Sequence, residues 1–113
     1  MADHPHDLSG KKAFVTGGKR RIGRGIALAL AEAGCDVGIN DLRRDADGED
    51  TLEMISQMGR EAEFLEGDIS DSSIVESMFE AFIERFGRID ILANNPFGGK
   101  DQTFLELTED NWD

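Results

Sequence analysis

The sequence is poor in the residues that mark several large classes of protein. It contains one cysteine, two prolines, one tryptophan and no tyrosine among 113 residues. The lone Cys35 has no partner for an internal disulfide, which argues against a disulfide-bonded secreted protein and favours a cytoplasmic location. No apolar run approaches the length of a membrane span, and the first residues lack the basic and apolar segments of a signal peptide.

Positive charge is also scarce overall. The 12 Lys and Arg face 24 Asp and Glu, which gives a formal net charge of −12. Nucleic acids and anionic membranes bind basic surfaces, so neither is expected as a partner. The stretch between Asp7 and Glu32 nevertheless has no acidic residue and holds a basic cluster of Lys11, Lys12, Lys19, Arg20, Arg21 and Arg24. Such a local cluster favours a small anionic ligand.

Length and composition predict one small globular domain. Hydrophobic residues make up 39% of the chain, enough for a core, and no linker, repeat or change of composition divides it. The polar start, which includes His4 and His6, is predicted to be a flexible tail over residues 1–9. The domain is then expected to span residues 10–113.

Hydrophobic periodicity predicts alternating strands and helices. Short β-branched and apolar runs favour strands over residues 12–16, 36–40, 61–66 and 88–95. Longer periodic segments favour helices over residues 22–34, 47–59 and 71–87, with another helix opening in residues 107–113 behind Thr108 as N-cap. The phenylalanines of residues 71–87 recur at helical spacing, which is more typical of a face packed on a sheet than of a ligand pocket.

This alternation predicts an α/β fold. Right-handed crossovers join such strands into a parallel sheet covered by helices on both faces, here with the expected strand order 3-2-1-4. Ligands bind such sheets outside the carboxyl ends of the strands, where the strand order reverses. The run "TGG" stands at the carboxyl end of the first predicted strand.

The stretch "TGGKRRIGRG", residues 16–25, has the composition of a phosphate-binding turn. Its glycines, Gly17, Gly18, Gly23 and Gly25, would let the backbone turn sharply and approach a ligand closely. The following helix offers unpaired N–H groups and the positive end of its dipole. Arg20 and Arg21 could add charge-assisted hydrogen bonds, so a pyrophosphate is the expected ligand.

Asp41 follows the second predicted strand. Its distance from the glycine-rich turn is about that at which a carboxylate receives the ribose of an adenosine. The alternative is that Asp41 simply begins a turn. The combination of strand, glycine-rich turn, helix and acidic residue favours the ribose role.

The motifs "VTGGKRRIG", "GDI" at Gly67–Ile69 and "DILANN" occur in order at the ends of successive predicted strands. Together they resemble the short-chain dehydrogenase/reductase family, over nearly the whole chain after the tail. The resemblance implies a Rossmann-like fold that holds a nicotinamide dinucleotide and moves hydride between it and a carbonyl or alcohol. By the same resemblance, the pyrophosphate lies at Gly17, Ile22 and Gly23, the adenosine ribose at Asp41, the adenine between Asp68 and Ile69, and the nicotinamide-side ribose beside Asn94.

Two positions differ from the family pattern. Arg21 stands where a glycine is usual, and Pro96 and Phe97 replace the Ala and Gly that normally follow the two asparagines. Pro96 fixes its own φ and restricts the residue before it, so the nicotinamide end of the site is expected to differ.

The choice of coenzyme has evidence on both sides. Asp41 would bind a free 2′-hydroxyl and repel a 2′-phosphate, which favours NAD. Three arginines, Arg20, Arg43 and Arg44, could instead receive the phosphate of NADP. We expect NAD, because a buried carboxylate facing a phosphate costs more than solvated arginines gain.

The family's catalytic serine, tyrosine and lysine have no counterparts here, since the sequence contains no tyrosine. The expectation is therefore an N-terminal, coenzyme-binding part of a reductase, without a catalytic residue and inactive by itself. Two alternatives stay open: a free-standing dinucleotide-binding or regulatory module, and one half of a two-chain enzyme. An unpaired edge on the fourth strand is expected to make the isolated chain marginally stable and self-associating.

Overall fold

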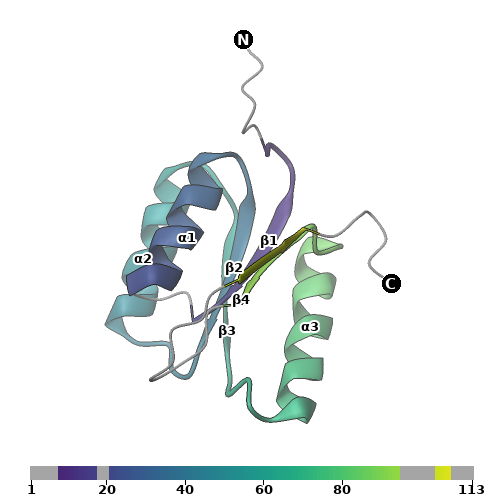
Figure 1. The fold of residues 1–113 in the computed structure, drawn as a ribbon. Helices are drawn as coiled ribbons and strands as arrows, with labels where there is room; N and C mark the ends of the chain where they lie inside the picture. The colour runs from purple at the N-terminus through teal and green to yellow at the C-terminus, as the bar shows by residue number, and fades with distance from the viewer. Residues whose placement is uncertain (1–7, 18–20, 95–103, 108–113) are drawn as a thin grey trace.

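The computed structural model describes residues 8–17, 21–94 and 104–107. These residues form a sheet with helices on both of its faces (Figure 1). The strands are β1 (Lys12–Thr16), β2 (Asp36–Asp41), β3 (Ala62–Glu66), β4 (Ile91–Asn94) and β5 (Phe104–Leu107). The helices are α1 (Arg21–Glu32), α2 (Ala46–Gln57) and α3 (Ser72–Phe86). Helices α1 and α2 lie on one face of the sheet and α3 on the other.

The strand order is β3-β2-β1-β4-β5, and the first four strands are parallel. This confirms the predicted α/β fold and the order 3-2-1-4. Thr16 stands level with Asn40 of β2 and with Asn94 of β4 in the register. The carboxyl ends of the central strands therefore meet at one edge of the sheet, where ligands bind in folds of this kind.

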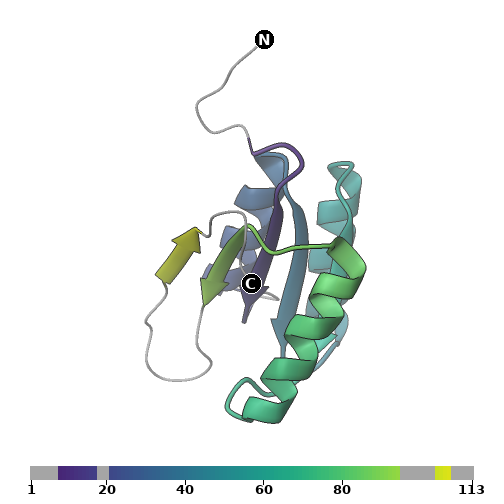
Figure 2. The same cartoon turned by 90° about the vertical axis from the view of Figure 1, so that its right-hand side faces the viewer.

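The far side of β4 is occupied by β5, so the prediction of an unpaired edge was wrong. Strand β5 pairs antiparallel with β4, with Leu107 opposite Ile91 (Figure 2). An antiparallel neighbour needs only a loop that turns the chain back, whereas a parallel one needs a full crossover. The helix predicted from residue 107 differs at Leu107, which belongs to the strand, and its other residues lie outside the described part.

The helix ends follow local capping rules. Asp45 caps α2 through a side-chain bond from the amide of Gly48, and Asp71 caps α3 through a bond from the amide of Ser73. Helix α3 ends at Gly87, whose φ of 93° is left-handed and favours glycine. The three predicted helices are thus confirmed to within two residues at each end. Helix α1, for example, ends at Glu32, two residues before its predicted end at Gly34.

Two hydrophobic clusters hold the layers together. One fills the space between the sheet and the pair α1 and α2, and the other joins the sheet to α3. In the second cluster the ring of Phe82 stacks on Phe14 with centroids 4.9 Å apart and lies 4.6 Å from Phe86. The phenylalanines of α3 are therefore packing residues, as predicted. Leu8 also packs on the first cluster and donates its amide to Ala33 O at 2.8 Å, so the packed structure includes part of the predicted tail.

Candidate functional site

The candidate site lies where the four parallel strands end. Gly17 follows β1, Asp41 closes β2, the turn with Asp68 and Ile69 follows β3, and Asn94 closes β4. The arrowheads of β1, β2 and β4 point the same way, and that of β5 points the opposite way (Figure 2). The parallel sheet thus brings together residues from four separate stretches of the sequence.

The turn after β1 leads directly into α1. Gly17 is buried with a φ of 66°, a left-handed conformation that glycine adopts readily. Gly23 is also buried, but within α1, and Gly25 is exposed there, so neither of these two glycines forms the sharp bend. Ile22 lies in the first turn of α1 with 55% of its surface exposed. The predicted residues Gly18 and Arg20 lie outside the described residues, as does the side chain of Arg21.

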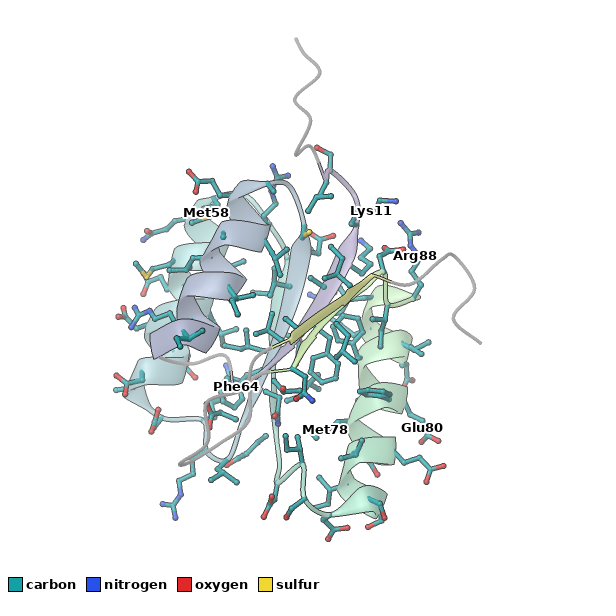
Figure 3. All side chains as sticks on the ribbon, viewed as in Figure 1. Lys11, Met58, Phe64, Met78, Glu80 and Arg88 are labelled. Carbon is teal, nitrogen blue, oxygen red and sulfur yellow. The ribbon has the colours of Figure 1, made fainter. Side chains whose placement is uncertain are left out.

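The basic cluster is more dispersed than the sequence suggests. Lys12 lies at the start of β1, at the opposite end of the sheet from Gly17, and its Nζ is 2.6 Å from Oδ2 of Asp36. Figure 3 shows Lys11 at that same end, near Arg88. Arg24 binds Asp50 of α2 at 2.7 Å. Lys12 and Arg24 therefore serve the scaffold, whereas Lys19, Arg20 and the side chain of Arg21 lie outside the described residues.

Asp41 is only 9% exposed at the end of β2. Its Oδ1 accepts the amide of Leu42 at 2.9 Å, and its backbone carbonyl accepts the amide of Gly67 at 3.0 Å. These two bonds hold the carboxylate at the edge of the sheet and tie the end of β2 to the turn after β3. A carboxylate at this place can accept hydrogen bonds from the donors of a ligand.

The two arginines after Asp41 are exposed. Arg44 forms an ion pair with Glu49, and its amide donates to Oε2 of Glu66 at 3.4 Å. The guanidinium of Arg44 also lies 6.0 Å from the ring centroid of Phe64. Arg44 is therefore partly neutralised before any ligand binds.

Asp68 and Ile69 form the turn between β3 and α3. Oδ1 of Asp68 accepts bonds from the amide of Ser70 at 2.9 Å and from its hydroxyl at 2.8 Å. These bonds lower the pKa of Asp68 below the ordinary value, so the group is anionic at neutral pH. Ile69 is half-buried and packs on the α3 cluster, which anchors the turn.

Asn94 is joined to the neighbouring strand. Its Oδ1 accepts the hydroxyl of Thr16 at 2.7 Å, across the paired ends of β1 and β4. Thr16 is 6% exposed, so this bond is largely sheltered from water. Sequence reasoning missed Thr16, although a threonine as the last residue of a strand beside the turn was visible in "VTGG".

Asn40 was missed as well. It is fully buried on β2 and contacts the turn after β3. The available signal was a strongly polar residue directly after the apolar run of Val37 to Ile39, at the end of the predicted strand.

Across residues 8–17, 21–94 and 104–107, no group of His, Cys, Asp and Glu is arranged to hold a metal ion. In the same ranges, no helix is both long and apolar enough to cross a membrane.

Comparison with known proteins gives a consistent result. The sequence profile of the family described as short chain dehydrogenase matches residues 11–113. The chain is 38% identical over 108 residues to 2-dehydro-3-deoxy-D-gluconate 5-dehydrogenase of Dickeya dadantii, covering 95% of this chain and 41% of that protein. The chain thus spans about two fifths of the length of this relative.

Solved structures share the fold. A short chain dehydrogenase from Burkholderia cenocepacia, solved in complex with NADP, superposes with a TM-score of 0.77 at 38% identity, over 80% of this chain and 37% of that one. The NADH-dependent reductase A1-R′, solved with NAD, superposes with a TM-score of 0.75 at 35% identity, over 82% of this chain and 38% of that one. The two neighbours carry different coenzymes.

Proposed function

This chain belongs to the short-chain dehydrogenase family, and on that premise we propose that it forms the coenzyme-binding part of an oxidoreductase. The enzyme would transfer hydride between a nicotinamide dinucleotide and a carbonyl or alcohol. The observation that carries the proposal is the meeting of Gly17, Asp41, Asp68 and Asn94 at one edge of the sheet. The chain alone has no tyrosine and is expected to bind coenzyme without turning it over.

The pyrophosphate is assigned to the turn after β1. The left-handed Gly17 bends the chain there, and the first turn of α1 supplies unpaired amides and a positive dipole end. Helix α1 has no acidic residue in its first turn, so no side chain of that turn repels an anion. Gly23 and the exposed Ile22 would lie against the ligand, and Arg20 and Arg21 would add positive charge.

The adenosine half is assigned to Asp41 and the turn after β3. Asp41 would accept hydrogen bonds from the ribose hydroxyls. The anionic Asp68 would accept a hydrogen bond from the amino group of adenine. Among the described contacts, both bonds from Ser70 reach Oδ1 of Asp68, which leaves Oδ2 available to the ligand. Ile69 would pack against the base, and Asn94 would stand beside the nicotinamide-side ribose.

We propose NAD as the preferred coenzyme. The nearly buried carboxylate of Asp41 would face the 2′-phosphate of NADP, and the resulting repulsion is poorly screened. The guanidinium of Arg44, one candidate partner for that phosphate, already forms an ion pair with Glu49. One structural neighbour was solved with NADP and another with NAD, so this preference has to be measured.

The test is a pair of calorimetric titrations with NADH and NADPH. We expect NADH to bind more tightly, and Asp41→Asn to reduce the ratio of the two affinities by about tenfold. Glu53→Gln, which removes the same charge from an exposed position on α2, should leave the ratio unchanged. Binding of neither coenzyme by folded protein would disprove the site, whereas tighter binding of NADPH would disprove only the preference for NAD.

We also propose that the isolated chain self-associates and that its location is cytoplasmic. Ile83 is 38% exposed on α3, beside the half-buried Val75 and Phe79, and this apolar strip supports association. Sedimentation of the wild-type chain and of Ile83→Lys tests it: a wild-type monomer at all concentrations would contradict the proposal.

A further inference from the structure

Asn40 is a fully buried polar residue in the middle layer of the fold. It stands on β2 directly before Asp41, and successive side chains of a strand point to opposite faces. Its Nδ2 lies 3.1 Å from the sulfur of Met78, so Asn40 faces α3. Met78 itself is buried on the side of α3 that meets the sheet (Figure 3).

The amide group of Asn40 donates to the end of β3. Its Nδ2 is 2.8 Å from Leu65 O and 3.1 Å from Gly67 O. Because both acceptors are carbonyl oxygens, the opposite orientation of the amide would set oxygen against oxygen. The acceptors therefore determine which way the side chain points.

The side chain of Asn40 has a destabilising feature that an apolar residue at this position would not have. Oδ1 of Asn40 is buried and has no hydrogen-bond partner among the described residues. A buried acceptor without a partner is destabilising. The donors of Asn40 must therefore provide something that a leucine or valine at this position would not.

What they hold is the turn that carries Asp68. Gly67 is bonded twice to β2, through its carbonyl to Asn40 and through its amide to Asp41 O at 3.0 Å. On its other side, a Cβ added at Gly67 would come within 2.7 Å of Cγ2 of Ile74 in α3. The turn is thus clamped between β2 and α3 and has little room to shift.

We propose that Asn40 is a positioning residue for the adenine-binding turn, Gly67–Ser70, of the coenzyme site. The inference rests on the proposed function. Strand β2 would then serve both parts of the adenosine: Asp41 contacts the ribose from one face, and Asn40 sets the position of Asp68 from the other. Because Asn40 and Asp41 are consecutive residues of one strand, the distance between the ribose contact and the support of the adenine-binding turn is fixed by the backbone of β2.

The test compares NADH with its analogue that carries hypoxanthine in place of adenine. The analogue has an oxygen where adenine has its amino group, so it cannot donate to Asp68 from that position. Its penalty in affinity therefore measures the contact between the base and the turn. Titrations are run on the wild-type chain, on Asn40→Leu, which has a similar volume and no donor, and on Asn40→Val, which also has no donor and suits a strand if leucine prevents folding.

In the wild type, we expect the analogue to bind about tenfold more weakly than NADH. In the Asn40 variants this penalty should fall to about threefold or less, because Asp68 no longer stands in place. Thr51→Val is the matched control: it removes a side-chain bond of another fully buried residue, from Thr51 Oγ1 to Asp47 O at 3.0 Å within α2. It should keep the full penalty.

A ligand-free measurement accompanies the titrations. The amide hydrogen of Gly67 should exchange faster in the Asn40 variants than in the wild type. In Thr51→Val the exchange rate of this amide should change only as much as the global stability does. Equal penalties in the wild type and the Asn40 variants would overturn the inference and leave the coenzyme site standing. Failure of the folded wild type to bind either dinucleotide would overturn the proposed function and the inference together.

Discussion

The hydroxyl of Thr16 donates to Oδ1 of Asn94 at 2.7 Å and so joins the carboxyl ends of β1 and β4. These strands are the two on either side of the point where the strand order reverses. Asn94 therefore has its side chain set by the scaffold before a ligand arrives.

Removing this bond should destabilise the chain. Thr16→Val keeps the shape of the side chain but leaves Oδ1 of Asn94 without its donor, at a cost of about 1 kcal/mol in the free energy of unfolding. Urea denaturation measures the change. Ser77→Ala, which removes an exposed hydroxyl bond to the backbone carbonyl of Ser73 within α3, should cost less than about half as much. Equal losses would show that the strand-end bond has no special weight.

Gly17→Ala should lower both stability and coenzyme affinity. A side chain at a φ of 66° is strained by about 1 kcal/mol, and the relaxed turn would withdraw its amides from the pyrophosphate. Gly59 is the control, because its φ of 83° is also left-handed, it lies after α2, and an added Cβ would meet no atom within 4 Å.

We therefore expect Gly59→Ala to lose a similar amount of stability and to bind NADH normally, while Gly17→Ala binds about tenfold more weakly. Calorimetric titration separates the two. Normal binding by Gly17→Ala would remove the turn from the site.

Acid should weaken the amino end of the sheet through Asp36. Burial works to raise the pKa of this carboxyl group, but bonds from Lys12 Nζ and the amide of Glu61 outweigh it and hold the pKa below the ordinary value. A depressed folded pKa means that the stabilisation is present above the unfolded pKa, roughly 4, and is lost as the pH falls through the folded one. Asp36→Asn should be less stable than wild type near neutral pH, and the difference should shrink in acid.

The measurement is the free energy of unfolding across that pH range. Glu76→Gln, at an exposed position on α3, should differ little from wild type at any pH. A constant difference for Asp36→Asn would contradict the assigned role of the ion pair.

The thiol of Cys35 should resist alkylation. Burial, and next the charges of Asp36 and Asp90, raise its pKa to about 11, and the side chain is fully enclosed. Little thiolate exists at neutral pH, and labelling should follow unfolding. Because the raised pKa favours the neutral thiol in the folded state, this stabilisation should disappear between about pH 9 and 11. Rapid labelling of the native chain, followed by mass spectrometry, would contradict this.

Much of the scaffold could be predicted from local patterns. Apolar runs of four to six residues and periodic helices depend on neighbours in the sequence, and the caps Asp45, Asp71 and Gly87 mark where helices begin and end. The crossover rule then restricts four parallel strands to few orders. Strand β5 escaped prediction because its four residues form a short run that becomes a strand only through its pairing with β4.

The candidate site divides in the same way. Gly17, Asp41 and Asp68 follow predicted strands and Asn94 lies at the end of another, so their shared edge could be inferred from the parallel sheet alone. The partners of the basic residues could not, since Lys12 meets Asp36 and Arg24 meets Asp50 only through the packing of separate elements.

By itself, then, the sequence determined the alternation of strands and helices, the glycine-rich turn and the acidic residues that follow the strands, because these depend on periodicity and on backbone preferences. Only the tertiary structure decided which charges neutralise one another, that β5 covers the edge of β4, and that Asn40 clamps the turn before Asp68. Such contacts join separate helices, strands and turns, and their geometry exists only once the sheet has formed.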